Sequence, residues 1–234
     1  MKNLTAAGLL TVLITVVLFG CSKDKGEKEI TTVLETGFTN DEVINFAKAY
    51  MPTFKSSIDR RYLSYHGFNS PAELDQVQIG TPFLWLGLTS DFKKDSTYDY
   101  LNKYITNGKE WWVPLMVGNE IRSFLWVQYL EGSLRWIGDG GYPGSVENCL
   151  NKYNIQNENR YIIEDHVYGS CVFIMTKTGD DLTIYPLDDY LPVGNWLPSY
   201  CKNLDKVYYS FKDLFYEFKK EGSCFGPVQP SGID

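Results

Sequence analysis

The chain has 234 residues, a formal net charge of −7 at pH 7 and an aromatic content of 15%. This length is enough for one large domain or two small ones with a hydrophobic core. An acidic chain without clusters of basic residues is poorly suited to nucleic acid, so we expect no nucleic-acid partner. The many tyrosine and tryptophan side chains fit either a β-rich core or a surface that binds carbohydrate.

The first twenty residues have the pattern of a secretion signal. A basic start at Lys2 precedes an uncharged and largely apolar run from Leu4 to Phe19. Such a run is typical of a signal peptide, and it is short for a membrane span, which needs about 20 apolar residues. We therefore expect residues 1–20 to be removed during export.

The end of this segment, Leu18-Phe19-Gly20-Cys21, resembles the lipobox of bacterial lipoproteins. The resemblance implies that Cys21 becomes the first mature residue and carries a diacylglyceryl group, usually with an N-linked acyl chain such as palmitate. Two or three acyl chains, at about 0.8 kcal/mol per buried CH₂, make a stable membrane anchor. Because Ser22 and not aspartate follows, the segment looks like that of a Gram-negative outer-membrane lipoprotein. An ordinary signal peptide followed by a chance cysteine is the alternative.

Residues 21–37 are expected to form a flexible tether between the lipid and the folded part. The segment is rich in charge, and its apolar side chains are only Ile30, Val33 and Leu34. So few apolar groups cannot offset the entropy lost on folding. The expected location is therefore the cell envelope, with the protein anchored by lipid at the outer membrane, on its periplasmic face or at the cell surface.

The folded part begins with helices. Thr39-Asn40-Asp41-Glu42 has the pattern of a capping box, and the apolar spacing after it predicts a helix from Asn40 to about Met51. Pro52 is expected to stop or bend this helix. A second, short helix is predicted from Ser70-Pro71 to about Val77, with proline in its first turn.

The middle of the chain predicts strands. Phe83–Leu88 reads as a strand and Ser96–Ile105 as a helix. Residues 111–138 then predict an antiparallel meander of three strands, which turn at Gly118-Asn119 and at Glu131-Gly132-Ser133. The predicted fold class is therefore α+β, with an antiparallel sheet and packed helices.

A glycine-rich break at residues 138–144 separates an N-terminal α+β region, 38–140, from a C-terminal α+β region, 141–234. The two regions are expected either as two domains or as one continuous domain. The elements predicted for the second region are a helix, a strand, a hairpin and a last helix: Ser145–Tyr153, Tyr161–Glu164, Cys171–Thr176 with Leu182–Tyr185, and Leu204–Lys220.

Four cysteines follow Cys21, and all lie in the second half of the chain: Cys149, Cys171, Cys201 and Cys224. In an oxidising compartment they predict two disulfides, with buried thiols as the alternative. A last helix of about 17 residues would span about 25 Å, whereas a disulfide needs Cα atoms within about 7 Å. This argument disfavours a Cys201–Cys224 bridge and leaves the two other pairings open.

The predicted hairpin around Gly118-Asn119 is apolar on both faces. If Val117 faces Glu120, Trp111 opposes Trp126 and Val113 opposes Phe124, with Arg122 at the rim of the same face. Either helices cover both faces, or one face is a binding surface. In the second case Trp111, Trp126 and Phe124, with Arg122 at their edge, are the candidate residues for stacking on a sugar or a peptide.

The sequence shows no motif for a catalytic centre, a metal site or a cofactor. The only histidines are His66 and His166, and neither lies in a zinc motif. Glu164-Asp165-His166 could supply a ligand or a base, but a solvated turn is the simpler interpretation. Carboxylates for glycoside hydrolysis can lie far apart in sequence, so their absence as a motif decides nothing.

The order of helix, strand, helix and meander over residues 40–138 broadly resembles the small cystatin-like and propeptide-like modules of bacterial envelopes. We therefore expect a lipid-anchored binding or accessory module with a glycan, a peptide or an envelope protein as its partner. The alternatives are an envelope hydrolase with dispersed carboxylates and a structural subunit of an outer-membrane complex.

Overall fold

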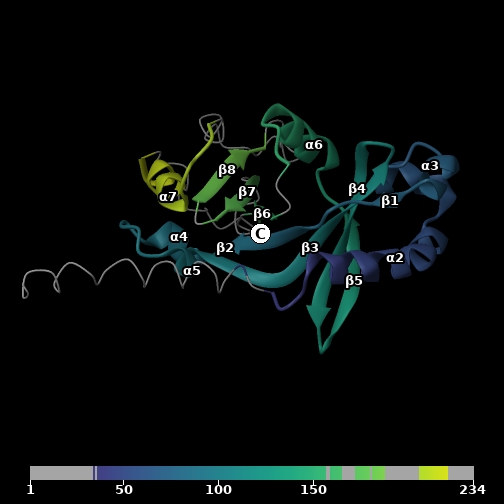
Figure 1. Cartoon of the computed structure of the whole chain (residues 1–234), viewed down its shortest axis with the longest axis horizontal. Helices are drawn as coiled ribbons and strands as arrows, with labels where there is room; N and C mark the ends of the chain where they lie inside the picture. The colour runs from purple at the N-terminus through teal and green to yellow at the C-terminus, as the bar shows by residue number, and fades with distance from the viewer. Residues whose placement is uncertain are drawn as a thin grey trace, which may run out of the picture.

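The computed structural model of the protein describes residues 34, 36–156, 159–164, 172–179, 181–187 and 206–220. It confirms an α+β fold with a mostly antiparallel sheet (Figure 1). The strands within these residues are β1 (Gln78–Ile79), β2 (Phe83–Leu88), β3 (Ile105–Val117), β4 (Glu120–Leu130), β5 (Ser133–Gly140), β6 (Arg160–Glu164), β7 (Val172–Thr178) and β8 (Asp181–Pro186). The described helical segments are α2 (Asn40–Ser57), η1 (Arg60–His66), α3 (Pro71–Asp75), α4 (Ser90–Lys94), α5 (Leu101–Tyr104), α6 (Pro143–Lys152) and α7 (Phe211–Lys220).

One sheet unites the two predicted regions. Its strand order is β5-β4-β3-β2-β6-β7-β8, with β1 paired to β3. The strands predicted for residues 111–138 are therefore one end of a larger sheet and not a separate three-stranded unit. The sheet crosses the glycine-rich break because β2 pairs with β6, and this is a parallel pair between two antiparallel groups.

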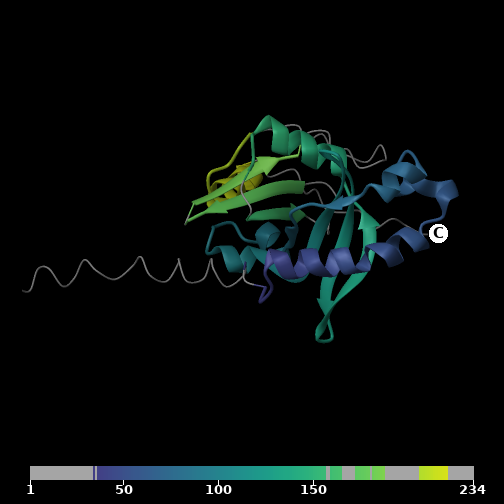
Figure 2. The same ribbon diagram turned by 45° about the vertical axis from the view of Figure 1, so that its right-hand side comes forward.

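Helices cover both faces of the sheet (Figure 2). On one face α2 contacts β1, β3 and β4, and on the other α6 contacts β4. The α2 face carries the larger hydrophobic core, which also holds α7. The α6 face carries a second core. Covering helices therefore account for the apolar character of both faces of the β3–β4 hairpin.

The first helix starts as predicted and ends later. Thr39 and Glu42 form both hydrogen bonds of the capping box. The helix continues through Pro52 to Ser57, because Met51 and Phe54 keep the same face buried beyond the proline. A capping box thus fixes the start of a helix, whereas burial decides its end.

Two other helices are shorter than predicted. The helix expected over Ser96–Ile105 is only α5, because β3 begins at Ile105 and pairs with β2 from that residue onward. The helix expected from Leu204 begins at Phe211, because Tyr208 makes an isolated β-bridge with Ile184. Within the described residues, no helix is long and apolar enough to cross a membrane.

The shorter α7 removes the argument against one disulfide pairing. Its 10 residues span only about 15 Å, so a bridge between cysteines 201 and 224 is no longer disfavoured and all three pairings are open. Cys149 is buried on α6, with its Sγ atom 3.5 Å from the carbonyl oxygen of Pro186. The other three cysteines, and Cys21, lie outside the described residues, so the disulfides stay a prediction.

Candidate functional site

The structure separates the aromatic residues that the sequence grouped into one face. The turn at Gly118-Asn119 and the Val117–Glu120 pair are confirmed, but a β-bulge follows them, and Leu115 pairs with Ser123. Trp111 therefore lies opposite Val127, and the register predicted beyond the turn is wrong by one residue. Arg122 is the extra residue of this bulge. Because of it, each later residue of β4 points to the face opposite the predicted one.

The three aromatic candidates become packing residues. Trp111 is 2% exposed and belongs to the core on the α2 face. Phe124 is fully buried in the other core, and half-buried Trp126 packs against that core and stacks on Trp112 at 5.6 Å. Trp111 and Trp126 thus do not share a surface.

Pro114 lies inside the sheet and not at its edge. Its carbonyl oxygen accepts a hydrogen bond from Gly80 N at 2.9 Å. In an antiparallel strand the nitrogen and the carbonyl oxygen of one residue point to the same neighbouring strand, so the nitrogen of Pro114 also points toward this side. On that side the neighbouring chain is interrupted between Ile79 of β1 and Phe83 of β2. The missing N–H of proline therefore faces the gap between two short strands, where no ladder hydrogen bond is lost.

Arg122, the fourth candidate, lies in a polar region at one end of the sheet. Its Nη2 atom forms ion pairs with Glu73 at 3.1 Å and with Glu120 at 2.9 Å. The backbone of Arg122 is also in close contact with η1, because a Cβ atom placed on Gly67 would lie 1.9 Å from the Arg122 carbonyl oxygen. The β4 bulge and η1 thus form one packed unit.

A candidate site follows from η1, and we call its four side chains, Tyr62, Tyr65, His66 and Asp139, the η1 corner. Tyr62 is 50% exposed and Tyr65 is 80% exposed. Their ring centroids are 5.9 Å apart and the rings are tilted by 51°. Tyr62 itself has non-helical backbone angles (φ −120°, ψ 25°), so η1 is kinked at this residue and the two rings are neighbours across the kink.

The conformation of η1 is fixed at both ends and at its centre. Asp59 caps the start by accepting a hydrogen bond from Arg61 N. Gly67 ends the segment in the left-handed region with φ of +84°, which glycine adopts without strain. Leu63 is buried between the two exposed tyrosines. These contacts anchor the backbone of η1, and the two exposed tyrosine rings project from it.

The η1 corner also includes a hydrogen bond between His66 of η1 and Asp139 of β5. Its Nδ1 atom lies 2.6 Å from Oδ2 of Asp139 on β5, and the two side chains are 29% and 12% exposed. This bond orients the imidazole ring. No hydrogen-bond partner for the other nitrogen, Nε2, lies among the residues that the structure describes. Nε2 can therefore donate to or accept from a ligand.

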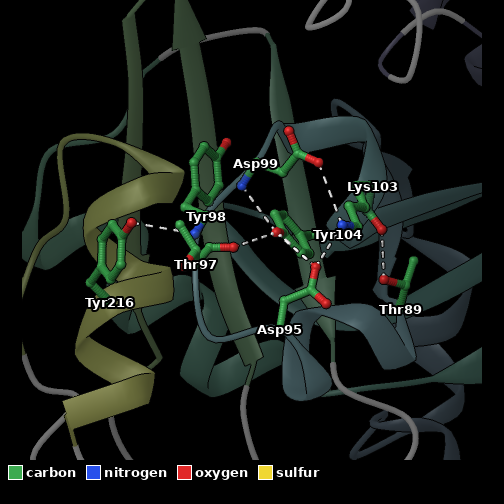
Figure 3. A network of polar contacts seen from close by, with 8 residues as sticks. All are labelled: Thr89, Asp95, Thr97, Tyr98, Asp99, Lys103, Tyr104 and Tyr216. Atoms are coloured by element: carbon green, nitrogen blue, oxygen red, sulfur yellow. Dashed lines mark hydrogen bonds and ion pairs between the residues drawn. The ribbon is translucent and has the colours of Figure 1, made fainter.

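A second polar cluster, the Tyr104 network, surrounds the start of β3 (Figure 3). The buried Tyr104 hydroxyl accepts a hydrogen bond from Asp99 N at 3.0 Å. It also lies 3.1 Å from Asp95 Oδ2 and 3.0 Å from the Thr97 carbonyl oxygen. Lys103 pairs with Asp95 at 2.7 Å and with Asp99 at 3.4 Å.

Proton affinities in the Tyr104 network reflect these contacts. The hydrogen bond from Lys103 lowers the pKa of Asp95 below its ordinary 3.8, and the same bond raises the pKa of Lys103. Burial raises the pKa of Tyr104, and it raises that of Tyr98 to about 12. Tyr98 N donates to the Tyr216 hydroxyl of α7 at 3.3 Å. Each charge faces its partner, so the network ties α7 and the loop before α5 to the sheet.

Carboxylates on the α6 face are engaged by tryptophans. Trp112 Nε1 donates to Glu110 and Trp85 Nε1 donates to Glu164, each at 3.0 Å. Glu164 also accepts from the Tyr142 hydroxyl at 3.3 Å. Residues 165 and 166 of the Glu164-Asp165-His166 triplet lie outside the described residues. In the described part of the chain, no group of three or more histidine, cysteine, aspartate or glutamate side chains could hold a metal ion.

Sequence reasoning missed three of the four residues of the η1 corner and noted only His66. Tyr62 and Tyr65 lie in a stretch to which no element was assigned, and Asp139 lies in the glycine-rich break. The available signal was the spacing of two tyrosines around one leucine, directly before histidine and glycine. Comparison with models of protein families, with curated proteins and with solved structures finds no match to this chain.

Proposed function

We propose that the chain is an exported lipoprotein, acylated at Cys21 and anchored at the outer membrane, whose folded domain is a binding module. The ligand is contacted at the η1 corner. The lipoprotein part of the proposal rests on the signal and lipobox pattern of residues 1–21.

The exposure of Tyr62 and Tyr65 carries the binding part of the proposal. At 50% and 80% exposure, both rings leave apolar area in water. Covering such area is favourable by about 25 cal/mol per Å². Clustered exposed aromatic side chains with polar neighbours are characteristic of binding surfaces. In contrast, the tryptophans that the structure describes pack in or against the two cores.

The length of α2 separates the η1 corner from the point where the tether joins the folded domain. The chain packs against the larger core at Leu34 and Phe38, before α2 begins, and η1 follows the other end of this helix (Figures 1 and 2). The 18 residues of α2 span about 27 Å. The η1 corner is thus separated from the attachment point of the tether by the length of a helix, which favours contact with a ligand away from the lipid anchor.

Two experiments test the proposal. Cells grown with labelled palmitate should yield labelled protein, and Cys21→Ala should abolish the label; normal labelling of that variant would end the lipoprotein proposal. A photo-reactive benzoylphenylalanine in place of Tyr65 should give cross-linked adducts in cells. The same group in place of Tyr209, which is 76% exposed, is the control. Equal adducts at both positions, or none at position 65, would contradict binding at the η1 corner.

A second candidate function, an envelope hydrolase, is favoured by the His66–Asp139 contact. A carboxylate on Nδ1 fixes the tautomer in which Nε2 can take a proton from an attacking water molecule. In this case Asp139→Asn should lower the rate of acetate release from acetylated polysaccharide by about a hundredfold. No acetate release above the buffer rate by the wild-type protein would exclude this candidate for such esters.

The disulfides belong to the same proposal, because an exported chain meets an oxidising compartment. Buried Cys149 would then be bridged to one of the cysteines at positions 171, 201 and 224. Peptide mapping of the denatured, non-reduced protein should find no free thiol apart from Cys21, and a free thiol at Cys149 would refute the bridge.

A further inference from the structure

We infer that the ligand of the η1 corner is a neutral polysaccharide, bound along the chain and not at its end. This inference rests on the proposed function and names the chemical class of its ligand. It is argued from the orientation of the two rings, from the polar atoms beside them and from the charge of the protein.

The two tyrosine rings suit a sugar chain because both are exposed. The guanidinium carbon of Arg61 lies over the Tyr62 ring, 5.6 Å from its centroid, so Tyr62 offers a ligand its other face. Pyranose rings present a C–H face that packs on an aromatic ring, with hydroxyl groups around the rim. Since Tyr62 and Tyr65 are tilted by 51°, both cannot lie flat against one sugar ring. They are placed to contact successive units of a chain, or one unit from two sides.

The polar atoms of the corner suit a ligand rich in hydroxyl groups. Within the described ranges, the hydroxyls of Tyr62 and Tyr65 have no hydrogen-bond partner, and neither has His66 Nε2. A hydroxyl group both donates and accepts, so it can satisfy a phenol or either form of an imidazole nitrogen. The Asp139 contact holds the imidazole in place before the ligand arrives, which lowers the entropy cost of binding.

The position of the corner favours the middle of a chain over its end. Two hollows lined by described residues, of about 190 and 290 Å³, lie away from the corner, one beside the start of α2 and one beside α7. Tyr65, at 80% exposure, stands out from the surface. A protruding pair of rings can lie against a long polymer but cannot enclose a terminal sugar.

Charge decides between neutral and anionic polymers. The protein carries a formal net charge of −7, which repels polyanions over about 10 Å at 0.1 M salt. Near the corner, Arg61 is paired with Asp59, and Arg122 with Glu73 and Glu120. Arg60, the first residue of η1, is exposed and pairs with no carboxylate among the described residues. The inference of an uncharged ligand therefore rests on the net negative charge of the protein, which disfavours a polyanion.

The test is native electrophoresis of the full-length protein in detergent, through gels that contain one polysaccharide each. The neutral probes are β-glucan, xylan and mannan, and the anionic probes are alginate and pectate. We expect at least one neutral polymer to retard the wild-type protein. The double variant Tyr62→Ala/Tyr65→Ala should bind it about tenfold more weakly or worse, because it loses both stacking faces.

Two controls separate stacking from folding and from general stickiness. Tyr65→Phe keeps the ring and should retain affinity to within about threefold, because only one hydroxyl contact is lost. Tyr209→Ala removes an equally exposed ring outside the corner and should leave retardation unchanged. Melting temperatures of all variants should match the wild type.

The results distinguish the inference from the proposed function. Retardation by anionic polymers alone, by no polymer, or equally for the double variant overturns the inference. If no neutral polymer binds but a cross-linker at position 65 still gives adducts that resist glycosidases, the corner binds a protein, and the binding function survives. If neither polymer nor adduct is found, both fail.

Discussion

The η1 corner and the Tyr104 network both contain tyrosine and acidic side chains, but the tyrosines are exposed in the first and buried or half-buried in the second. Tyr104 is fully buried, and its hydroxyl is surrounded by Asp95, Thr97 and Asp99. Tyr65 is 80% exposed, and no protein group among the described residues meets its hydroxyl.

The difference teaches how to separate structural from functional polar clusters in this fold. The Tyr104 network contains the shifted pKa values, which often mark functional sites. However, its charges neutralise one another, and its hydrogen bonds join three segments of the chain. The η1 corner instead leaves the hydroxyls of two tyrosines, one imidazole nitrogen and exposed aromatic area available to a ligand. Here unfilled hydrogen-bonding capacity is the better guide to binding than perturbed proton affinity.

The largest effect is expected at Trp111, which the sequence had grouped with surface candidates. Trp111→Ala should lower the free energy of unfolding by about 3–5 kcal/mol, because a large buried side chain leaves a cavity. Denaturant unfolding measures the change. A change smaller than about 1 kcal/mol would mean that this tryptophan is not a core residue.

The next effect is expected at Gly67, where the corner meets the β4 bulge. Gly67→Ala combines a left-handed backbone with a Cβ atom 1.9 Å from the Arg122 carbonyl oxygen, and we expect a loss of about 2–4 kcal/mol. The matched control is Gly132→Ala, at φ of +86° with no atom within 4 Å of the new methyl group. It should cost only the backbone part, about 1–2 kcal/mol. Equal losses for the two variants would refute the close approach.

A smaller loss is expected from removing one hydroxyl of the Tyr104 network. Tyr104→Phe leaves the amide of Asp99 without its acceptor and should lower the free energy of unfolding by about 1–3 kcal/mol. Tyr100→Phe, at a position that is 41% exposed, should change stability by less than about 0.5 kcal/mol. An unchanged melting temperature for Tyr104→Phe would remove the structural role of the network.

The ion pair of this network should give a pH dependence at acid pH. Since the folded state lowers the pKa of Asp95, the pair stabilises the fold above the ordinary value of 3.8 and loses this effect as pH falls through the folded value. Asp95→Asn should therefore reduce the fall in melting temperature below pH about 4. At alkaline pH the raised pKa of Lys103 keeps the lysine charged, so the contribution is lost only as pH rises through that higher value. If the melting temperature of the variant falls as steeply below pH about 4 as that of the wild type, the pairing of Asp95 with Lys103 is contradicted.

The smallest effect on stability is expected in the η1 corner itself. Tyr65→Ala should change the free energy of unfolding by less than about 0.5 kcal/mol, because the ring is already in water. The combination of negligible destabilisation with loss of cross-linking or polysaccharide binding would sharpen the contrast with Trp111. A loss above about 1 kcal/mol would place Tyr65 among the packing residues instead.

The sequence predicted an element correctly where a short local pattern decides its geometry. The capping box at Thr39, the strand Phe83–Leu88 and the turn at Gly118-Asn119 are all present as predicted. Helical spacing failed over Ser96–Ile105, where pairing with β2 draws Ile105 into a strand. Propensity is a weak prior, and a neighbouring strand overrides it.

The candidate site was less accessible to sequence reasoning, for two physical reasons. A β-bulge carries no clear composition signal, so a register counted from the turn placed Trp111 and Trp126 on one face. The contact between His66 and Asp139 joins residues 73 positions apart, and no local pattern indicates such a meeting. Exposure of Tyr62 and Tyr65 likewise depends on what η1 packs against.

The parallel pairing of β2 with β6 has a consequence for how the chain acquires its structure. While the polypeptide is being made, β2 can pair with β3 at once, but its other edge stays open until β3, β4, β5 and α6 have all been synthesised. An uncovered strand edge is a template for association with another chain. The all-apolar sequence Phe83–Leu88 therefore makes the half-finished chain prone to aggregation. Substitutions that delay β6 should lower the yield of folded protein even where they leave its final stability unchanged.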